Sequence, residues 1–138
     1  MEAEAATLYG SSEIEENESA SGGAHVGYID RDGAGVRFTI TQSRDVIYLR
    51  YASENSGNIN IYINGIKQGT IYLEESGSYM YDYSIVAITG LNLTENSTLA
   101  FQYDSYMENV AANIDFIAYN LSDTQMVTDV ALQTVQTN

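Results

Sequence analysis

The sequence predicts an all-β protein, a two-sheet antiparallel β-sandwich of the jelly-roll type. Short segments in which apolar and polar residues alternate recur along the chain, as expected for strands with one buried face. Clusters of glycine and polar residues separate these segments and are typical of turns. No convincing helical pattern occurs before residue 121. About eight to ten short strands with this spacing favour a sandwich over other all-β folds.

Four strands follow directly from apolar residues spaced two apart. Their inward-facing sets are Val36, Phe38 and Ile40; Ile47, Leu49 and Tyr51; Ile59, Ile61 and Ile63; and Leu99, Phe101 and Tyr103. The third set is followed at once by Asn64-Gly65. Both residues tolerate a positive φ, so this dipeptide predicts a tight hairpin turn, with the returning strand over residues 69–73.

Turns and a polar tail complete the predicted organisation. Turn-like clusters lie at residues 19–23, 32–35, 53–57 and 74–78, and the acidic run at residues 13–18 is expected to be a solvated loop. Residues 121–138 are polar, rich in Thr and Gln, and lack alternation. We therefore expect one β-sandwich domain over residues 1–120 and a linker or tail remnant over residues 121–138.

The acidic net charge of the chain limits the classes of molecule that it can bind. The 138 residues carry 19 acids against 5 bases, a formal net charge of −14. Such a surface repels nucleic acid and anionic lipid and is compatible with neutral polymers and cations, although solubility alone also accounts for it. No apolar stretch approaches the roughly 20 residues that a membrane-spanning helix needs. We expect neither a nucleic acid nor a membrane as partner.

Catalytic motifs are few. The chain has no cysteine, no Gly-x-Ser-x-Gly or His-Glu-x-x-His motif, and one histidine, His25, expected to be a partly exposed strand residue. Among catalytic options, a pair of carboxylates in a small glycosidase stays open. The signal is unspecific, because with 19 acids some pair lies at a suitable distance by chance.

Acidic residues near both ends of the domain suggest a metal site. Glu2-Ala3-Glu4 begins the chain and Asn113-Ile114-Asp115 lies in the last predicted strand. If the first and last strands of the sandwich meet, three carboxylates converge and repel one another unless a cation lies among them. A site of hard oxygen ligands without cysteine favours calcium over zinc.

Aromatic residues suggest a sugar site. The chain has 12 tyrosines, 3 phenylalanines and no tryptophan. Tyr28, Tyr79, Tyr81 and Tyr106 lie at strand edges or beside Gly/Ser loops, where an exposed ring can pack against the C–H face of a sugar. For any single tyrosine, a place in the core or on the surface without a ligand is the alternative.

Taken together, these segments resemble the carbohydrate-binding modules of families 6 and 35, β-sandwich appendages of polysaccharide-degrading enzymes. The resemblance covers residues 2–120 and is specific as an ensemble. The matching segments, in chain order, are Glu2-Ala3-Glu4-Ala5-Ala6, Ser21-Gly22-Gly23-Ala24-His25-Val26-Gly27-Tyr28-Ile29-Asp30, Tyr48-Leu49-Arg50-Tyr51-Ala52, Ile63-Asn64-Gly65, Glu75-Ser76-Gly77-Ser78-Tyr79 and Asn113-Ile114-Asp115-Phe116-Ile117.

The resemblance implies two sites. A structural calcium would be held by Glu2, Glu4 and Asp115, with a backbone carbonyl near residues 21–23. A sugar would bind in the loops at one end of the sandwich, between or beside the rings of Tyr28 and Tyr79, with Asn113 bonding its hydroxyls. Similar sandwiches also bind ligands on the concave face of a sheet, and this alternative stays open.

Two features depart from the family pattern or extend it. Tyr79 stands where such modules usually carry tryptophan. Asn113 and Asp115 would share one face of a regular strand, so a bend or bulge is required if one of them serves the sugar site and the other the calcium site. Beside Tyr28, the sequence Asp30-Arg31-Asp32-Gly33 suggests either a second calcium at the sugar site or a contact between Arg31 and a sugar carboxylate. It is also an ordinary turn sequence.

The sequence thus predicts a non-catalytic polysaccharide-binding module. It would target an appended, secreted glycan-degrading enzyme to plant or microbial cell-wall polysaccharide, as a monomeric part of an extracellular multidomain protein. The alternative is a cell-surface or scaffold sandwich that serves protein contacts or spacing. The sequence does not name the polysaccharide.

Overall fold

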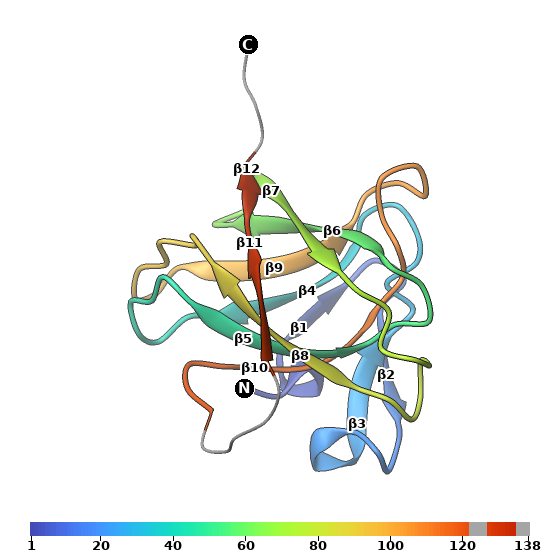
Figure 1. Ribbon diagram of the computed structural model, residues 1–138. Coiled ribbons are helices and arrows are strands. Elements are labelled where there is room, and N and C mark those ends of the chain that lie inside the picture. The colour runs from blue at the N-terminus through green and yellow to red at the C-terminus, as the bar shows by residue number, and fades with distance from the viewer. Residues whose placement is uncertain (122–126, 135–138) are drawn as a thin grey trace.

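The computed structural model describes residues 1–121 and 127–134. Within them, two sheets of six strands each face one another (Figure 1). One sheet has the order β1-β4-β9-β6-β7-β12 and the other β11-β8-β5-β10-β3-β2. The strands are β1 (Thr7–Tyr9), β2 (Glu13–Glu16), β3 (Ala24–Gly27), β4 (Ala34–Thr39), β5 (Ile47–Ala52), β6 (Gly57–Ile63), β7 (Ile66–Leu73), β8 (Ser84–Thr89), β9 (Thr98–Tyr103), β10 (Asn113–Ala118), β11 (Val127–Ala131) and β12 (Gln133–Thr134).

Neighbouring strands are antiparallel, with the exception of β11, which runs parallel to β8. The helical elements of the described residues are two single 3₁₀ turns, η1 (Ala3–Ala5) and η2 (Ser21–Gly23). The predicted all-β sandwich is therefore confirmed. No helix in these residues is long and apolar enough to cross a membrane.

The core lies between the sheets and contains the predicted inward-facing residues. Eleven of the twelve are buried, and Ile63 packs partly buried against them. At the centre, Phe38 of β4 and Phe101 of β9 meet edge to face, with ring centroids 6.1 Å apart. Each fully buried side chain of this size stabilises the fold by about 1.5–3 kcal/mol, so the alternating pattern supplies much of the driving force for folding.

The hairpin between β6 and β7 has the predicted turn. Ile63 pairs with Ile66, and the two residues between them, Asn64 and Gly65, have φ of 52° and 79°. Two successive positive φ values define the turn type whose twist matches the flanking strands.

The chain start differs from the expected strand. Glu2 forms an isolated bridge with Phe116 of β10, and the chain then enters η1, where the Ala5 amide donates to the Glu2 carbonyl. The buried Ala3 anchors this turn. The start of the domain still lies against β10, as the metal hypothesis requires.

The expected tail contains two strands. β11 pairs with β8 at the edge of one sheet, and β12 pairs with β7 at the edge of the other (Figure 1). Both are mostly exposed, so backbone hydrogen bonds rather than an apolar face hold them, and their sequence shows no alternation. The rest of the expected tail, residues 122–126 and 135–138, lies outside the described residues.

Candidate functional site

A pocket of about 260 Å³ brings together four of the five residues predicted to bind a ligand. We call it the loop pocket, and it is lined by Glu15, Tyr28, Asp30, Tyr79, Met80, Ala111 and Asn113. The fifth predicted residue, Arg31, is exposed and is not among the lining residues. The lining comes from four separate segments, so the fold, not the local sequence, assembles the pocket.

Tyr28 owes its exposure to an unusual backbone conformation. It is a non-glycine residue with φ of 60°, a left-handed conformation that costs about 1–2 kcal/mol for an L-residue. The adjoining Ile29 is 1% exposed, whereas Tyr28 is 50% exposed. Its carbonyl accepts a hydrogen bond from the Ser11 hydroxyl at 2.7 Å. Strain of this kind is concentrated at binding sites, and here it leaves the ring available at the pocket.

Asn113, which also lines the pocket, is held by a hydrogen bond. Its Nδ2 donates to the Tyr79 carbonyl at 2.9 Å, and the side chain is nearly buried. A Cβ at Gly27 would lie 3.2 Å from Asn113 Oδ1 and 3.3 Å from Glu15 Oε1. Both polar atoms therefore approach β3 closely at a position where a larger residue would push them apart.

Sequence reasoning missed Glu15. The acidic run at residues 13–18, expected to be a solvated loop, forms strand β2 over Glu13–Glu16, and Glu15 pairs with His25 of β3. Because only Glu15 of its three glutamates is even partly buried, the pattern resembled a loop. The sequence carried no local signal for this strand, because its pairing with β3 appears only in the fold.

His25 holds Glu15 in place. The prediction of a partly exposed histidine was wrong, since the side chain is completely buried. Its Nε2 lies 2.6 Å from Glu15 Oε1, and its Nδ1 lies 2.6 Å from the Tyr83 hydroxyl. With both ring nitrogens bonded, the imidazole satisfies its polar atoms in the core and orients the Glu15 carboxylate at the pocket.

The loop pocket is rich in hydrogen-bond acceptors. Its titratable lining consists of two carboxylates, Glu15 and Asp30, and two phenols, with no Lys or Arg. Carboxylate oxygens accept hydrogen bonds from hydroxyl groups, and exposed aromatic rings pack against C–H faces. The arrangement suits a neutral, hydroxyl-rich ligand and disfavours a bare anion.

A second cluster joins the three carboxylates predicted to bind metal. One oxygen from each of Glu2, Glu4 and Asp115 lies within 4.8 Å of the others. Asp115 accepts hydrogen bonds from the Ser21 amide and from Arg50, and the Ser21 hydroxyl donates to Glu2 Oε1 at 2.7 Å. Glu2 Oε2 and Glu4 Oε1 are buried and have no hydrogen-bond partner within the described residues. Two orphaned carboxylate oxygens fit a cation.

Electrostatics support this fit. Burial raises the pKa of Glu4, and the nearby Glu2 and Asp115 charges add to the effect. Burial also raises the pKa of Asp115, although hydrogen bonds from Arg50 and the Ser21 amide oppose it. Removing carboxylates from water without full compensation costs free energy, so the cluster is favourable for a hard cation with oxygen ligands.

A β-bulge separates the two sites. In the pairing of β10 with β5, Ile114 lies opposite Tyr51 and Phe116 opposite Arg50, so the register shifts at Asp115. The extra residue re-aims the side chain, and Asn113 lines the loop pocket while Asp115 enters the acidic cluster. The sequence analysis expects a bend or bulge between Asn113 and Asp115, and this bulge meets that expectation.

No protein-family model and no curated protein sequence matches the chain, but solved structures do. A family 35 carbohydrate binding module from Clostridium thermocellum is 25% identical, with a TM-score of 0.70, and the match covers 86% of this chain and 95% of that module. The predicted resemblance to such modules is confirmed.

Two glycan-degrading enzymes contain a similar sandwich. An exo-beta-1,3-galactanase from Phanerochaete chrysosporium, solved with galactose, is 28% identical with a TM-score of 0.71 over 85% of this chain. The catalytic domain of a GH87 alpha-1,3-glucanase, in complex with nigerose, has a TM-score of 0.71 over 91% of this chain, and its 19% identity shows the fold alone. The chain spans 28% of each enzyme structure.

Proposed function

We propose that this chain is a non-catalytic polysaccharide-binding module that targets an appended, secreted glycan-degrading enzyme to plant or microbial cell-wall polysaccharide. One observation carries the proposal: Tyr28, Tyr79 and Asn113 line a single pocket together with Glu15 and Asp30. The comparisons support the proposal, because this chain matches a family 35 module over 95% of that module's length. It matches each of the two enzymes over only 28% of the enzyme chain.

In this proposal the loop pocket binds one or a few sugar units. The Tyr28 ring packs against a pyranose face, and the carboxylates of Glu15 and Asp30 accept hydrogen bonds from its hydroxyls. One shallow site of this kind gives a Kd between about 1 mM and 1 μM. The benefit is a raised effective concentration of the attached enzyme near its substrate, without any chemistry in the module.

The proposal includes a structural calcium at Glu2, Glu4 and Asp115. The ion would compensate the charge of the three carboxylates and hold the chain start against β10 and the η2 turn. A second calcium in the loop pocket would draw on Glu15 and Asp30, and calcium-dependent binding of an acidic polysaccharide would reveal it.

The test is a panel of soluble and insoluble polysaccharides, neutral and acidic, assayed by affinity gel and glycan array with and without calcium. We expect wild-type protein to bind at least one neutral polysaccharide. Tyr28→Ala and Tyr79→Ala should each lose that binding without loss of fold, measured by circular dichroism.

Tyr106→Ala is the matched control, because Tyr106 is 80% exposed and does not line the loop pocket. If wild-type protein binds no polysaccharide, the scaffold interpretation replaces the proposal. Release of reducing sugar from any panel substrate would instead identify a small glycosidase.

A further inference from the structure

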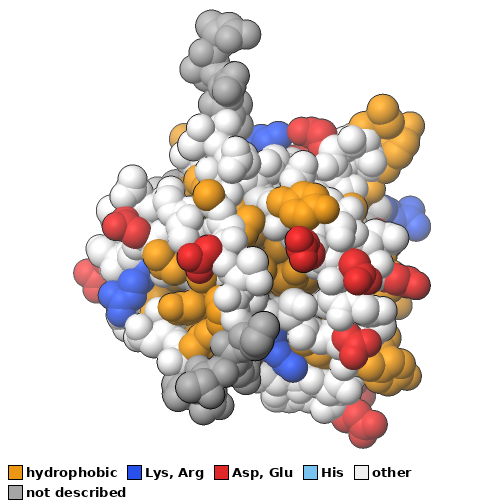
Figure 2. Space-filling view, viewed as in Figure 1, with side chains coloured by type: hydrophobic (Ala, Val, Ile, Leu, Met, Phe, Trp, Pro, Cys, Tyr) orange, Lys and Arg blue, Asp and Glu red, His pale blue; other side chains and the backbone are white. Residues whose placement is uncertain are grey.

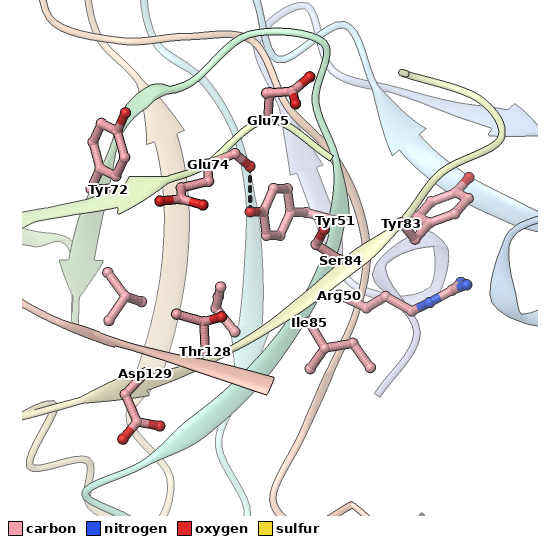
Figure 3. Close-up of a pocket in the computed structure, with 12 residues that line it drawn as sticks. Arg50, Tyr51, Tyr72, Glu74, Glu75, Tyr83, Ser84, Ile85, Thr128 and Asp129 are labelled. Atoms are coloured by element: carbon pink, nitrogen blue, oxygen red, sulfur yellow. Dashed lines mark hydrogen bonds between the residues drawn. The ribbon is translucent and has the colours of Figure 1, made fainter. Parts of the chain in front are cut away.

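A larger pocket, of about 580 Å³, opens at the edge of the sandwich where β7 ends, β8 begins and β11 passes (Figure 3). We call it the edge pocket, and the residues that decide its chemistry are Tyr72, Glu74, Glu75, Ser84, Thr128 and Asp129. Its volume lies within the range of about 300–1,000 Å³ that is usual for ligand sites. None of its lining residues lines the loop pocket.

A buried tyrosine, Tyr51, lines the edge pocket. Tyr51 is 1% exposed, and its hydroxyl donates to the Glu74 carbonyl at 2.6 Å, the contact drawn at the centre of Figure 3. Burial raises the pKa of Tyr51 to about 12, so the phenol stays neutral. This hydrogen bond links the residue that follows β7 to β5.

Three acidic residues, Glu74, Glu75 and Asp129, line the pocket, and all three are exposed. In Figure 3 the Asp129 carboxylate points away from the other lining side chains, which leaves Glu74 and Glu75 as the main acceptors. None of the three forms a side-chain hydrogen bond or an ion pair with the part of the chain that the structure describes. The one cationic lining residue, Arg50, is committed to Asp115 and lies 4.3 Å from the Tyr83 ring centroid. The pocket therefore offers acceptors and repels anions.

Apolar surface lies beside these acceptors. The Tyr72 ring is 50% exposed and Val130 is partly buried, whereas Ile85 and Val86 are only 8% and 6% exposed. The hydroxyls of Ser84 and Thr128 add groups that donate or accept. Acidic side chains are also spread over the face shown in Figure 2, with Lys or Arg side chains at several separate places among them.

We propose that the edge pocket is a second carbohydrate site, which takes a neutral, hydroxyl-rich oligosaccharide segment. Sugar hydroxyls donate to the exposed carboxylates, and sugar C–H faces pack against Tyr72 and Val130. An acidic glycan is disfavoured by like charge. A polyamine would satisfy the carboxylates but offers no ring face to the Tyr72 ring. An amino sugar has the same C–H face as a neutral sugar, and the salt dependence of its binding distinguishes the two.

Both pockets share one connecting segment. The chain between β7 and β8 gives Glu74 and Glu75 to the edge pocket, then Tyr79 to the loop pocket, and returns with Tyr83 to the edge pocket. Two weak sites on one module raise the avidity for a polymer that reaches both, or link two chains. Substitutions can remove either site separately.

The experiment uses ¹⁵N-labelled protein titrated with xylohexaose, cellohexaose, β-1,3-galactotriose and nigerotetraose, in wild-type, Tyr28→Ala and Tyr72→Ala backgrounds. We expect amide shifts at residues 72–75, 83–86 and 128–130 that persist in Tyr28→Ala. In Tyr72→Ala the affinity at these residues should fall about tenfold, equivalent to about 1.4 kcal/mol, while Tyr106→Ala leaves it unchanged.

Tyr72 is half exposed, so this variant is expected to fold, and its thermal melt checks that it does. Glu74→Gln with Glu75→Gln provides a second, isosteric test and should weaken binding at the same residues. Absence of shifts at the edge pocket with every neutral probe overturns the inference, whether or not the loop pocket binds. Binding of a cationic glucosamine hexamer but of no neutral oligosaccharide, abolished by 0.5 M salt, would also overturn the inference.

Discussion

Asp104 shows how single side chains hold the outer face of the first sheet. Its carboxylate accepts hydrogen bonds from Tyr62 at 2.7 Å, from Gln102 at 2.6 Å and from the buried Asn60. Burial raises the pKa of Asp104, but hydrogen bonds from Tyr62, Gln102 and Asn60 and the charge of Lys67 outweigh it, so the net pKa lies below 3.8. The ionised form is thus favoured in the folded state.

Replacement by asparagine should reveal this contribution. Asp104→Asn places an amide against several donors and should lower the free energy of unfolding by about 1–3 kcal/mol at pH 7. A depressed folded-state pKa stabilises above the unfolded value, and that stability is lost as pH falls through the folded pKa. The difference between the variant and wild type should therefore shrink below about pH 3.8. Urea unfolding at pH 7 and pH 3 measures it, and a pH-independent difference would contradict the assignment.

Single residues also mark the limit of sequence reasoning about the site. Tyr28, Tyr79 and Asn113 were predicted because the short segments around them resemble those of carbohydrate-binding modules. Glu15 was not, since its role depends on the buried His25, whose second partner Tyr83 lies 58 residues away. A contact of that separation leaves no local pattern.

At the scale of elements, strands with alternating apolar residues and the β6–β7 hairpin were predicted, and other strands were missed. β8 was missed because its residues 85–88 form a continuous buried run without alternation. β2, β11 and β12 lie at sheet edges, and most of their residues are exposed. Their strand conformation is imposed by pairing with a neighbour, so hydrophobic alternation cannot report it.

Removing the terminal strands tests where the folded unit ends. The boundary near Asn120 stays a prediction, and a chain ending there loses β11 and β12 but keeps every strand that fills the core. We expect it to fold, with a melting temperature lower by about 3–8 °C, because the partly buried Val130 and Leu132 are lost. Thermal melts followed by near-UV circular dichroism measure this.

The same truncation separates the two pockets. Thr128, Asp129 and Val130 disappear from the edge pocket, whereas the loop pocket keeps all its lining. Sugar binding should remain at the loop pocket and weaken at the edge pocket. A truncated chain without native near-UV signal would place the domain boundary beyond residue 120.

At the scale of the whole molecule, the acidic cluster connects the chain start with β10 and the η2 turn. Saturating calcium should raise the melting temperature by several degrees, since an ion at 100 times its Kd stabilises by about 2.7 kcal/mol. Chelator should reverse the shift, measured by differential scanning fluorimetry or calorimetry.

Glu4→Gln is the variant that tests the assignment. It removes one charge from the cluster but keeps the shape, and should abolish the calcium response while the chelated protein stays folded. Asp45→Asn changes a carboxylate outside the cluster and serves as the control. An identical calcium shift in Glu4→Gln would place the ion elsewhere.

Near its C-terminal end, the chain crosses from one sheet to the other within a few residues. β11 is the last strand of one sheet, β12 is the last strand of the other, and Leu132 alone separates them. Tension applied from this end would load the two-residue β12 first and then draw β11 away from β8. We therefore expect two small unfolding steps, the detachment of β12 and then of β11, before the core between the sheets opens.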